Sequence, residues 1–155
     1  MRSSVDVHNY LLDSDVPHEL SSLPGPLRDL SDAPDVLGLP AAVVGRPVVL
    51  GDGHGVVVAL VPAAAEADLH GIGALLRRPG LRPVAPDQAP VLTGYLLPAV
   101  PPVALECDAD VVIDECLAEQ DVVYTASGEA GVILKVRGAD LVKVTDALVF
   151  PIAKR

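Results

Sequence analysis

The stretch YTASGEAG, residues 124–131, holds the groups that are best placed in this sequence to contact an anion. Ser127 and Gly128 come directly after a strand-like run, at the point where a turn exposes backbone N–H groups. Such a turn binds negatively charged groups in some proteins, and in others it simply joins two strands. The residues alone leave both interpretations open.

A second stretch, GYLLPAVPP at residues 94–102, has no charged residue and contains three prolines, one glycine and one tyrosine. Proline fixes φ and lacks a backbone N–H, so this segment is stiff and poor in hydrogen-bond donors. Its apolar residues follow neither helical nor strand periodicity. We expect it to form either a buried crossover between two elements or one wall of a pocket.

Other reactive side chains do not form a recognisable constellation. No G-x-S-x-G sequence is present, and no serine stands in the context of a catalytic triad. Asp114 follows an apolar run and is best explained as the cap of the turn after a strand. Cys107 and Cys116 are nine residues apart, which is not a usual zinc-ligand spacing. No partner at metal-ligand spacing is found for the four histidines, His8, His18, His54 and His70. We therefore expect no metal site and no cofactor.

The charge of the chain limits its partners. The formal net charge is −10, and residues 71–102 are the only net-positive stretch, with Arg77, Arg78 and Arg82 against one acidic residue. Proteins that grip nucleic acid through its phosphates usually present a basic face. The sequence therefore argues against DNA binding and extensive backbone contacts, but it allows a small site for a nucleic-acid end.

Length and composition predict one domain spanning residues 1–155. Half of the residues are hydrophobic, and valine-rich runs such as GVVVALV indicate buried strands. No apolar run reaches the roughly 18 residues that a membrane helix needs. Because the first residues also lack the pattern of a signal peptide, we expect a cytoplasmic protein with no membrane contact.

Local patterns predict an α+β fold with a mixed, largely antiparallel sheet and flanking helices. Residues 46–62 should form a hairpin around Asp52 and Gly53. Helices are expected over residues 4–12, 67–78 (capped at Asp68), 86–94 and 138–145. Short strands are expected over residues 16–20, 81–85, 109–114, 121–126, 131–137 and 147–152. Helical spacing also occurs at Leu27, Leu30 and Val36–Leu37, where Pro34 should start or interrupt a helix.

Four motifs in order along the chain resemble the YbaK/prolyl-tRNA synthetase-associated domain family. They are the opening VHNYLLDSDVPHEL, the LGLP before the strand GRPVVL, the loop TGYLLPAVPPV, and the closing unit from VVIDECLAEQ to VTDALV. Members of this family are editing deacylases that hydrolyse wrongly charged aminoacyl-tRNA. The resemblance covers nearly the whole chain and implies a trans-editing enzyme for a tRNA carrying a small amino acid such as Ala, Cys or Ser.

The resemblance also implies roles for individual residues. Arg46 stands where the family has a lysine. The resemblance implies that it is the catalytic residue and contacts a phosphate or carbonyl oxygen of the substrate. The residues expected to contact the 3′ end of the aminoacyl-tRNA are Gly94, Tyr95, Pro101, Pro102, Ser127 and Gly128. Prolyl-tRNA synthetase is the implied protein partner.

Two departures from the family pattern favour alternatives. Arginine keeps the charge of lysine but does not readily lose a proton. Pro98 and Ala99 replace paired glycines, and Ala104 replaces a later one, so any contact made by the first glycine's amide is lost. The chain is thus either an editing enzyme or a weakened, inactive homologue that acts as a binding or regulatory protein. An unrelated α+β domain with a chance likeness is the third possibility.

Overall fold

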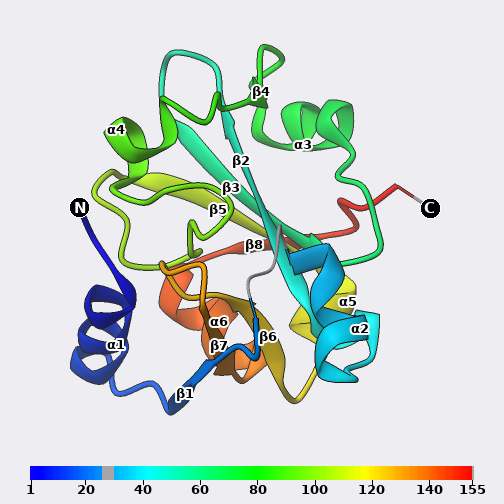
Figure 1. Cartoon of the computed structure of the whole chain (residues 1–155). Helices are drawn as coiled ribbons and strands as arrows, with labels where there is room; N and C mark the ends of the chain where they lie inside the picture. Colours follow the sequence, from blue (N-terminus) through cyan, green and yellow to red (C-terminus); the bar gives the residue numbers. More distant parts are fainter. Residues whose placement is uncertain (26–29, 155) are drawn as a thin grey trace.

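The computed structural model describes residues 1–25 and 30–154 as two β-sheets surrounded by helices (Figure 1). The described helices are α1 (Ser4–Asp13), α2 (Ala33–Leu37), α3 (Leu69–Leu76), α4 (Ala89–Thr93), α5 (Glu115–Ala118) and α6 (Gly138–Thr145), with the 3-10 helices η1 (Leu30–Asp32) and η2 (Ala41–Val43). The strands are β1 (His18–Ser22), β2 (Gly45–Gly51), β3 (Val56–Pro62), β4 (Arg82–Pro83), β5 (Ala109–Asp114), β6 (Val123–Ala126), β7 (Val132–Val136) and β8 (Leu148–Phe150). None of the helices in this part of the chain is long and apolar enough to cross a membrane.

The larger sheet has five strands in the order β4-β2-β3-β5-β8. Strands β2 and β3 form the expected antiparallel hairpin, in which Val49 lies opposite Val58. Strand β5 runs parallel to β3, and β8 runs parallel to β5. The sheet is therefore mixed.

The smaller sheet has three antiparallel strands in the order β1-β7-β6. It meets the larger sheet at the start of β2, where an isolated bridge pairs Val44 with Tyr124. Next to this bridge, the hydroxyl of Thr125 donates a hydrogen bond to the carbonyl of Gly45 at 2.8 Å. The α+β class with mostly antiparallel pairing is confirmed, although the strands divide between two sheets.

The hydrophobic core lies on both faces of the hairpin. On one face, Val58 and Leu60 of β3 pack in a cluster that contains Tyr95 and Leu134. On the other face, Val57, Ala59 and Val61 pack with Ile72 of α3, among others. Because both faces of β3 are covered, its sequence is a continuous apolar run.

The tip of the hairpin is fastened by Arg78, which follows α3. Its guanidinium donates from Nε and Nη2 to the two carboxylate oxygens of Asp52, at 2.9 and 2.7 Å, and from Nη1 to Asp110 at 3.2 Å. These hydrogen bonds hold the pKa of Asp52 well below its ordinary value. The same pairing raises the pKa of Arg78. One arginine thus ties the turn, helix α3 and strand β5 together.

Most elements agree with the sequence patterns, and the differences have local causes. Helix α1 begins after Ser3, whose side chain accepts from Val5 N, and its capping box is closed by Asp6. Helix α4 begins at Ala89 rather than Pro86, because the chain first makes a turn in which Gln88 N donates to the carbonyl of Ala85. Of the expected helical positions near residue 30, Leu27 lies outside the described residues.

Asp114 acts as a cap, as expected, and it also holds the end of the chain. One carboxylate oxygen accepts from Cys116 N at 3.1 Å, at the start of the short helix α5, which the sequence analysis missed. The other accepts from the amides of Ile152 and Ala153 at 3.0 and 3.2 Å. The carboxylate is completely buried. Four residues are too few for helical periodicity to be detected.

Candidate functional site

The proline-rich loop begins at Gly94, which ends helix α4 with a positive φ of 87°. A Cβ at this position would lie 2.8 Å from the Cγ and Cδ atoms of Glu106. The positive φ favours glycine at this position, whereas the exposed Glu106 side chain can move aside. The loop therefore leaves α4 in one fixed direction.

Tyr95 anchors the loop in the core. Its side chain is fully buried, and its hydroxyl donates a hydrogen bond to the carbonyl of Ala104 at 2.7 Å. Burial disfavours the phenolate and raises the pKa of Tyr95 to about 12. The neutral Tyr95 side chain therefore connects the two ends of the loop through its hydrogen bond.

The prolines of the loop lie at different depths. Pro101 and Pro102 are buried, whereas Pro98 is exposed and follows a cis peptide bond. Between them, the carbonyl of Ala99 accepts a hydrogen bond from Gly128 N at 2.9 Å. The loop is thus a buried crossover, and it also forms one wall of the hollow described below. Its backbone contacts the turn after β6 directly.

The turn after β6 is held by its own polar groups. The hydroxyl of Ser127 donates to the carbonyl of Val132 at 2.7 Å and accepts from Glu129 N at 3.3 Å. Gly128 has a φ of 98°, and a Cβ there would lie 2.8 Å from Cε1 of Tyr95. In this structure, Ser127 and the Gly128 amide therefore serve the turn and its contact with the loop.

A small hollow lies between the loop and the turn. It has a volume of about 20 Å³, enough for roughly one water molecule or one methyl group. The residues lining it are mainly apolar: Leu23, Leu30, Pro98, Ala99, Ala126, Glu129, Ala130 and Val132. The hollow is therefore small and mainly apolar, with Glu129 as a charged neighbour.

Arg46 stands at the second position of β2, beside strand β6. The two strands are joined by the bridge between Val44 and Tyr124 and by the hydrogen bond from Thr125 to the Gly45 carbonyl. The Nη2 atom of Arg46 donates to the carbonyl of Ala65 at 2.7 Å. Its guanidinium is thus directed toward the segment after β3 rather than into the hollow.

The N-terminal residues join the loop and the turn, a function that the sequence analysis missed. Arg2 donates its backbone N–H to the carbonyl of Gly94 and its Nη1 to that of Ala104, each at 3.0 Å. Both the backbone N–H and the hydroxyl of Ser4 donate to one carboxylate oxygen of Glu129, at 3.0 and 2.7 Å. These contacts span about 90 to 125 residues of sequence, so no local pattern could have indicated them.

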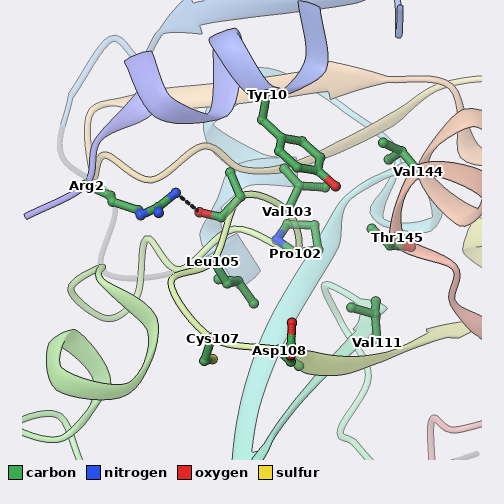
Figure 2. A pocket seen from close by; sticks show the side chains of 12 residues that line it. Arg2, Tyr10, Pro102, Val103, Leu105, Cys107, Asp108, Val111, Val144 and Thr145 are labelled. Atoms are coloured by element: carbon green, nitrogen blue, oxygen red, sulfur yellow. Dashed lines mark hydrogen bonds between the residues drawn. The ribbon is translucent and has the colours of Figure 1, made fainter. Parts of the chain in front are cut away.

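A larger, open groove adjoins the end of the loop (Figure 2). It has a volume of about 490 Å³, and its walls come from helix α1, the end of the loop, strand β5 and helix α6. Figure 2 shows Arg2 and Tyr10 on one side of it, with Cys107 and Asp108 on the other. Burial raises the pKa of the Cys107 thiol, so this cysteine is less reactive than a free one. Pro102 also lines the groove, so different residues of the loop line the two cavities.

The structure therefore brings six of the seven expected site residues into one contiguous unit. Gly94, Tyr95, Pro101 and Pro102 belong to the loop, and the turn with Ser127 and Gly128 is hydrogen-bonded to it. Arg46 belongs to the neighbouring strand, one residue away from the Gly45 carbonyl that binds Thr125.

Comparison with known proteins adds a family and a set of similar folds. A family model for the aminoacyl-tRNA editing domain matches residues 25–144. A solved structure of the hypothetical protein APE2540 is 24% identical, with 96% of this chain and 99% of that chain covered and a TM-score of 0.88. A candidate trans-editing enzyme for prolyl-tRNA synthetase is 22% identical, with 100% and 99% covered and a TM-score of 0.87. At these identities, the two structures establish the fold.

Proposed function

The chain belongs to the family of aminoacyl-tRNA editing domains, and we propose that it is a trans-editing deacylase. The reaction is hydrolysis of the ester between the tRNA 3′ end and a small amino acid such as Ala, Cys or Ser. The proposed place of action is the cytoplasm, where aminoacyl-tRNA is made.

The observation that carries this proposal is the direct contact between the loop and the turn around the small hollow. Its volume of about 20 Å³ supports a substrate side chain of about the size of a methyl group. One methylene changes the binding free energy in an apolar pocket by only about 1–3 kcal/mol. A rigid wall is therefore needed to exclude larger amino acids. The buried Tyr95 and the prolines supply that rigidity.

In the proposed site, Gly94, Tyr95, Pro101 and Pro102 do not line the hollow themselves, but they hold the loop whose Pro98 and Ala99 form its wall. Ser127 and Gly128 offer polar contacts to the substrate. The substrate must compete for them with the hydrogen-bond partners that these two residues have in the structure. Arg46 contacts a phosphate or the ester carbonyl oxygen, and for this its guanidinium must turn away from the Ala65 carbonyl that it binds now. A guanidinium has five N–H donors, so donors remain for the substrate.

The proposed chemistry needs no protein nucleophile. A water molecule attacks the ester carbonyl, negative charge develops on the carbonyl oxygen, and the ribose oxygen leaves with a proton. Donors aimed at the developing charge stabilise this transition state. Pro98 has no backbone N–H, so the donors must come from elsewhere, and Arg46 is the cation that we assign to this task.

The direct test is to incubate the purified protein with alanyl-, cysteinyl- and seryl-tRNA and to measure release of the amino acid. We expect hydrolysis of at least one of them, and hydrolysis of all three at the uncatalysed rate, even at high protein concentration, would refute the proposal. Ala130→Leu, which fills the edge of the hollow from an exposed position, should raise KM for the best substrate. Ala139→Leu, an exposed alanine on α6, is the matched control and should leave the kinetics unchanged.

A second candidate function is a binding protein that keeps the fold without the reaction. It is favoured by Arg46 and by Pro98, which stands exposed at the hollow without an amide donor. The double variant Arg46→Lys and Pro98→Gly separates the two candidates. Its activity should exceed that of the wild type if the wild type is an enzyme with a weakened site, and should stay at background if the site is only a binding site.

We also propose that prolyl-tRNA synthetase presents the substrate to this protein. With a net charge of −10, the chain should bind tRNA weakly by itself. A pull-down with prolyl-tRNA synthetase and charged tRNA tests this, and the absence of a complex at micromolar concentrations of both proteins would contradict it.

A further inference from the structure

Two histidines that are ten residues apart in the sequence meet at the junction of α1 and β1. His8 lies in the middle of helix α1, and His18 is the first residue of strand β1. The Nδ1 atom of His8 lies 2.8 Å from the Nε2 atom of His18, and the ring planes are inclined at 62°. The turn between the two elements thus directs one ring nitrogen of each histidine at the other.

We propose that these two nitrogens form a binding site for a divalent transition-metal ion of the Zn²⁺ class. Imidazole is a favoured ligand for Zn²⁺, Cu²⁺ and Ni²⁺. The expectation that the histidines have no partner rested on their spacing in the sequence, and the fold brings two of them together. This proposal is independent of the editing reaction.

A hydrogen bond to His18 prepares it for this role. Its Nδ1 atom lies 2.8 Å from the carbonyl oxygen of Val16. Since a carbonyl only accepts, Nδ1 carries the proton, and the Nε2 lone pair of the neutral ring points at His8. Histidines that bind metal ions commonly donate their second ring N–H to a backbone carbonyl in this way.

Binding an ion requires both rings to move. Without a metal ion, a proton lies between the two nitrogens, and Nδ1 of His8 carries it when His18 is neutral. If that proton moves to Nε2 of His8, the two lone pairs face each other. A tetrahedral ion with two nitrogens at about 2.0–2.1 Å holds them about 3.4 Å apart, with its two bonds at about 109°. The separation of 2.8 Å must therefore grow by about 0.6 Å, and both rings must tilt until their lone pairs meet at the ion.

The site also has room for further ligands and a path for entry. An open hollow of about 320 Å³ adjoins the pair, and Ser4, Val5 and Leu20 complete its lining. His8 is exposed, and His18 is half-buried. Within residues 1–25 and 30–154, no group of three or more His, Cys, Asp or Glu side chains is arranged for a metal ion. The ion would therefore have two protein ligands, with water in the remaining positions.

Isothermal titration of the reduced protein with ZnCl₂ at pH 7.5 tests the site. We expect one ion per chain, weaker binding at pH 5.5 because protons compete for the nitrogens, and loss of binding in both His8→Ala and His18→Ala. His54→Ala, which removes an exposed histidine in the β2–β3 turn, is the matched control and should bind like the wild type.

Thermal unfolding provides a second measurement, since an ion that binds only the folded chain raises the melting temperature. Zn²⁺ should raise it in the wild type and in His54→Ala, but not in His8→Ala. Circular dichroism checks that the variants are folded. Equal binding in the wild type, His8→Ala and His18→Ala, or no binding by the wild type, would overturn the proposal.

Discussion

Replacing Gly128 by alanine is the sharpest test of the contact between the loop and the turn. The new Cβ would lie 2.8 Å from Cε1 of Tyr95 and 3.1 Å from the backbone of Ser3. Neither neighbour can move easily, because Tyr95 is fully buried and Ser3 caps helix α1. The positive φ of 98° adds strain that glycine does not have.

The cost can be worked out from these two terms. A left-handed backbone conformation costs a residue with a Cβ about 1–2 kcal/mol, and overpacking a rigid core site costs about 1–3 kcal/mol. We therefore expect Gly128→Ala to lower the free energy of unfolding by about 2–5 kcal/mol. Deacylation of the best substrate should fall as well, since the wall of the small hollow must shift.

Urea unfolding measures this effect, with Gly131→Ala as the matched control in the same turn. A Cβ at Gly131 meets nothing within 4 Å, and its φ is not in the positive range. That variant should stay within about 0.5 kcal/mol of the wild type, as most surface substitutions do. If the two variants differ by less than about 1 kcal/mol at the same m-value, the proposed packing of Gly128 against Tyr95 is wrong.

Three further substitutions test other parts of the structure. Tyr95→Phe should lower the free energy of unfolding by about 1 kcal/mol. Because the pKa of Tyr95 is raised to about 12, the wild type should also lose stability between about pH 10 and 12, and the variant should lose less in a pH series of urea melts. Since the pKa of Asp52 is lowered, its pairing with Arg78 stabilises the fold above about pH 4 and is lost on acidification below it. Asp52→Asn should therefore have a lower melting temperature than the wild type at pH 7, with the difference shrinking toward pH 2. Asp114→Ala leaves three amides without their acceptor and should cost at least about 2 kcal/mol in a urea melt. A loss below about 0.5 kcal/mol would contradict its role at the end of the chain.

The sequence predicts those elements whose signals are local. The serine cap predicts helix α1, and the valine runs around Asp52 and Gly53 predict the hairpin of β2 and β3. Helical spacing over residues 138–145 predicts α6. Each signal lies within at most 17 consecutive residues, so it does not depend on contacts with distant parts of the chain. The division into two sheets is different, because the pairing of β1 with β7 joins residues that are 110 to 118 positions apart.

The candidate site is predictable only in part for the same reason. The prolines and Gly94 mark the loop, and Ser127 with Gly128 marks the turn, but neither pattern says that the two meet. Their contact depends on the Gly128 amide and the carbonyl of Ala99. The orientation of the Arg46 side chain cannot be predicted from the sequence either, because it depends on a carbonyl that lies 19 residues away.

The contacts of Arg2 and Ser4 have a practical consequence for anyone who purifies this protein. Proteolysis between Ser3 and Ser4 would remove the cap of α1 and the Arg2 hydrogen bonds in a single event. Intact mass should therefore be recorded before the stabilities or rates of two preparations are compared.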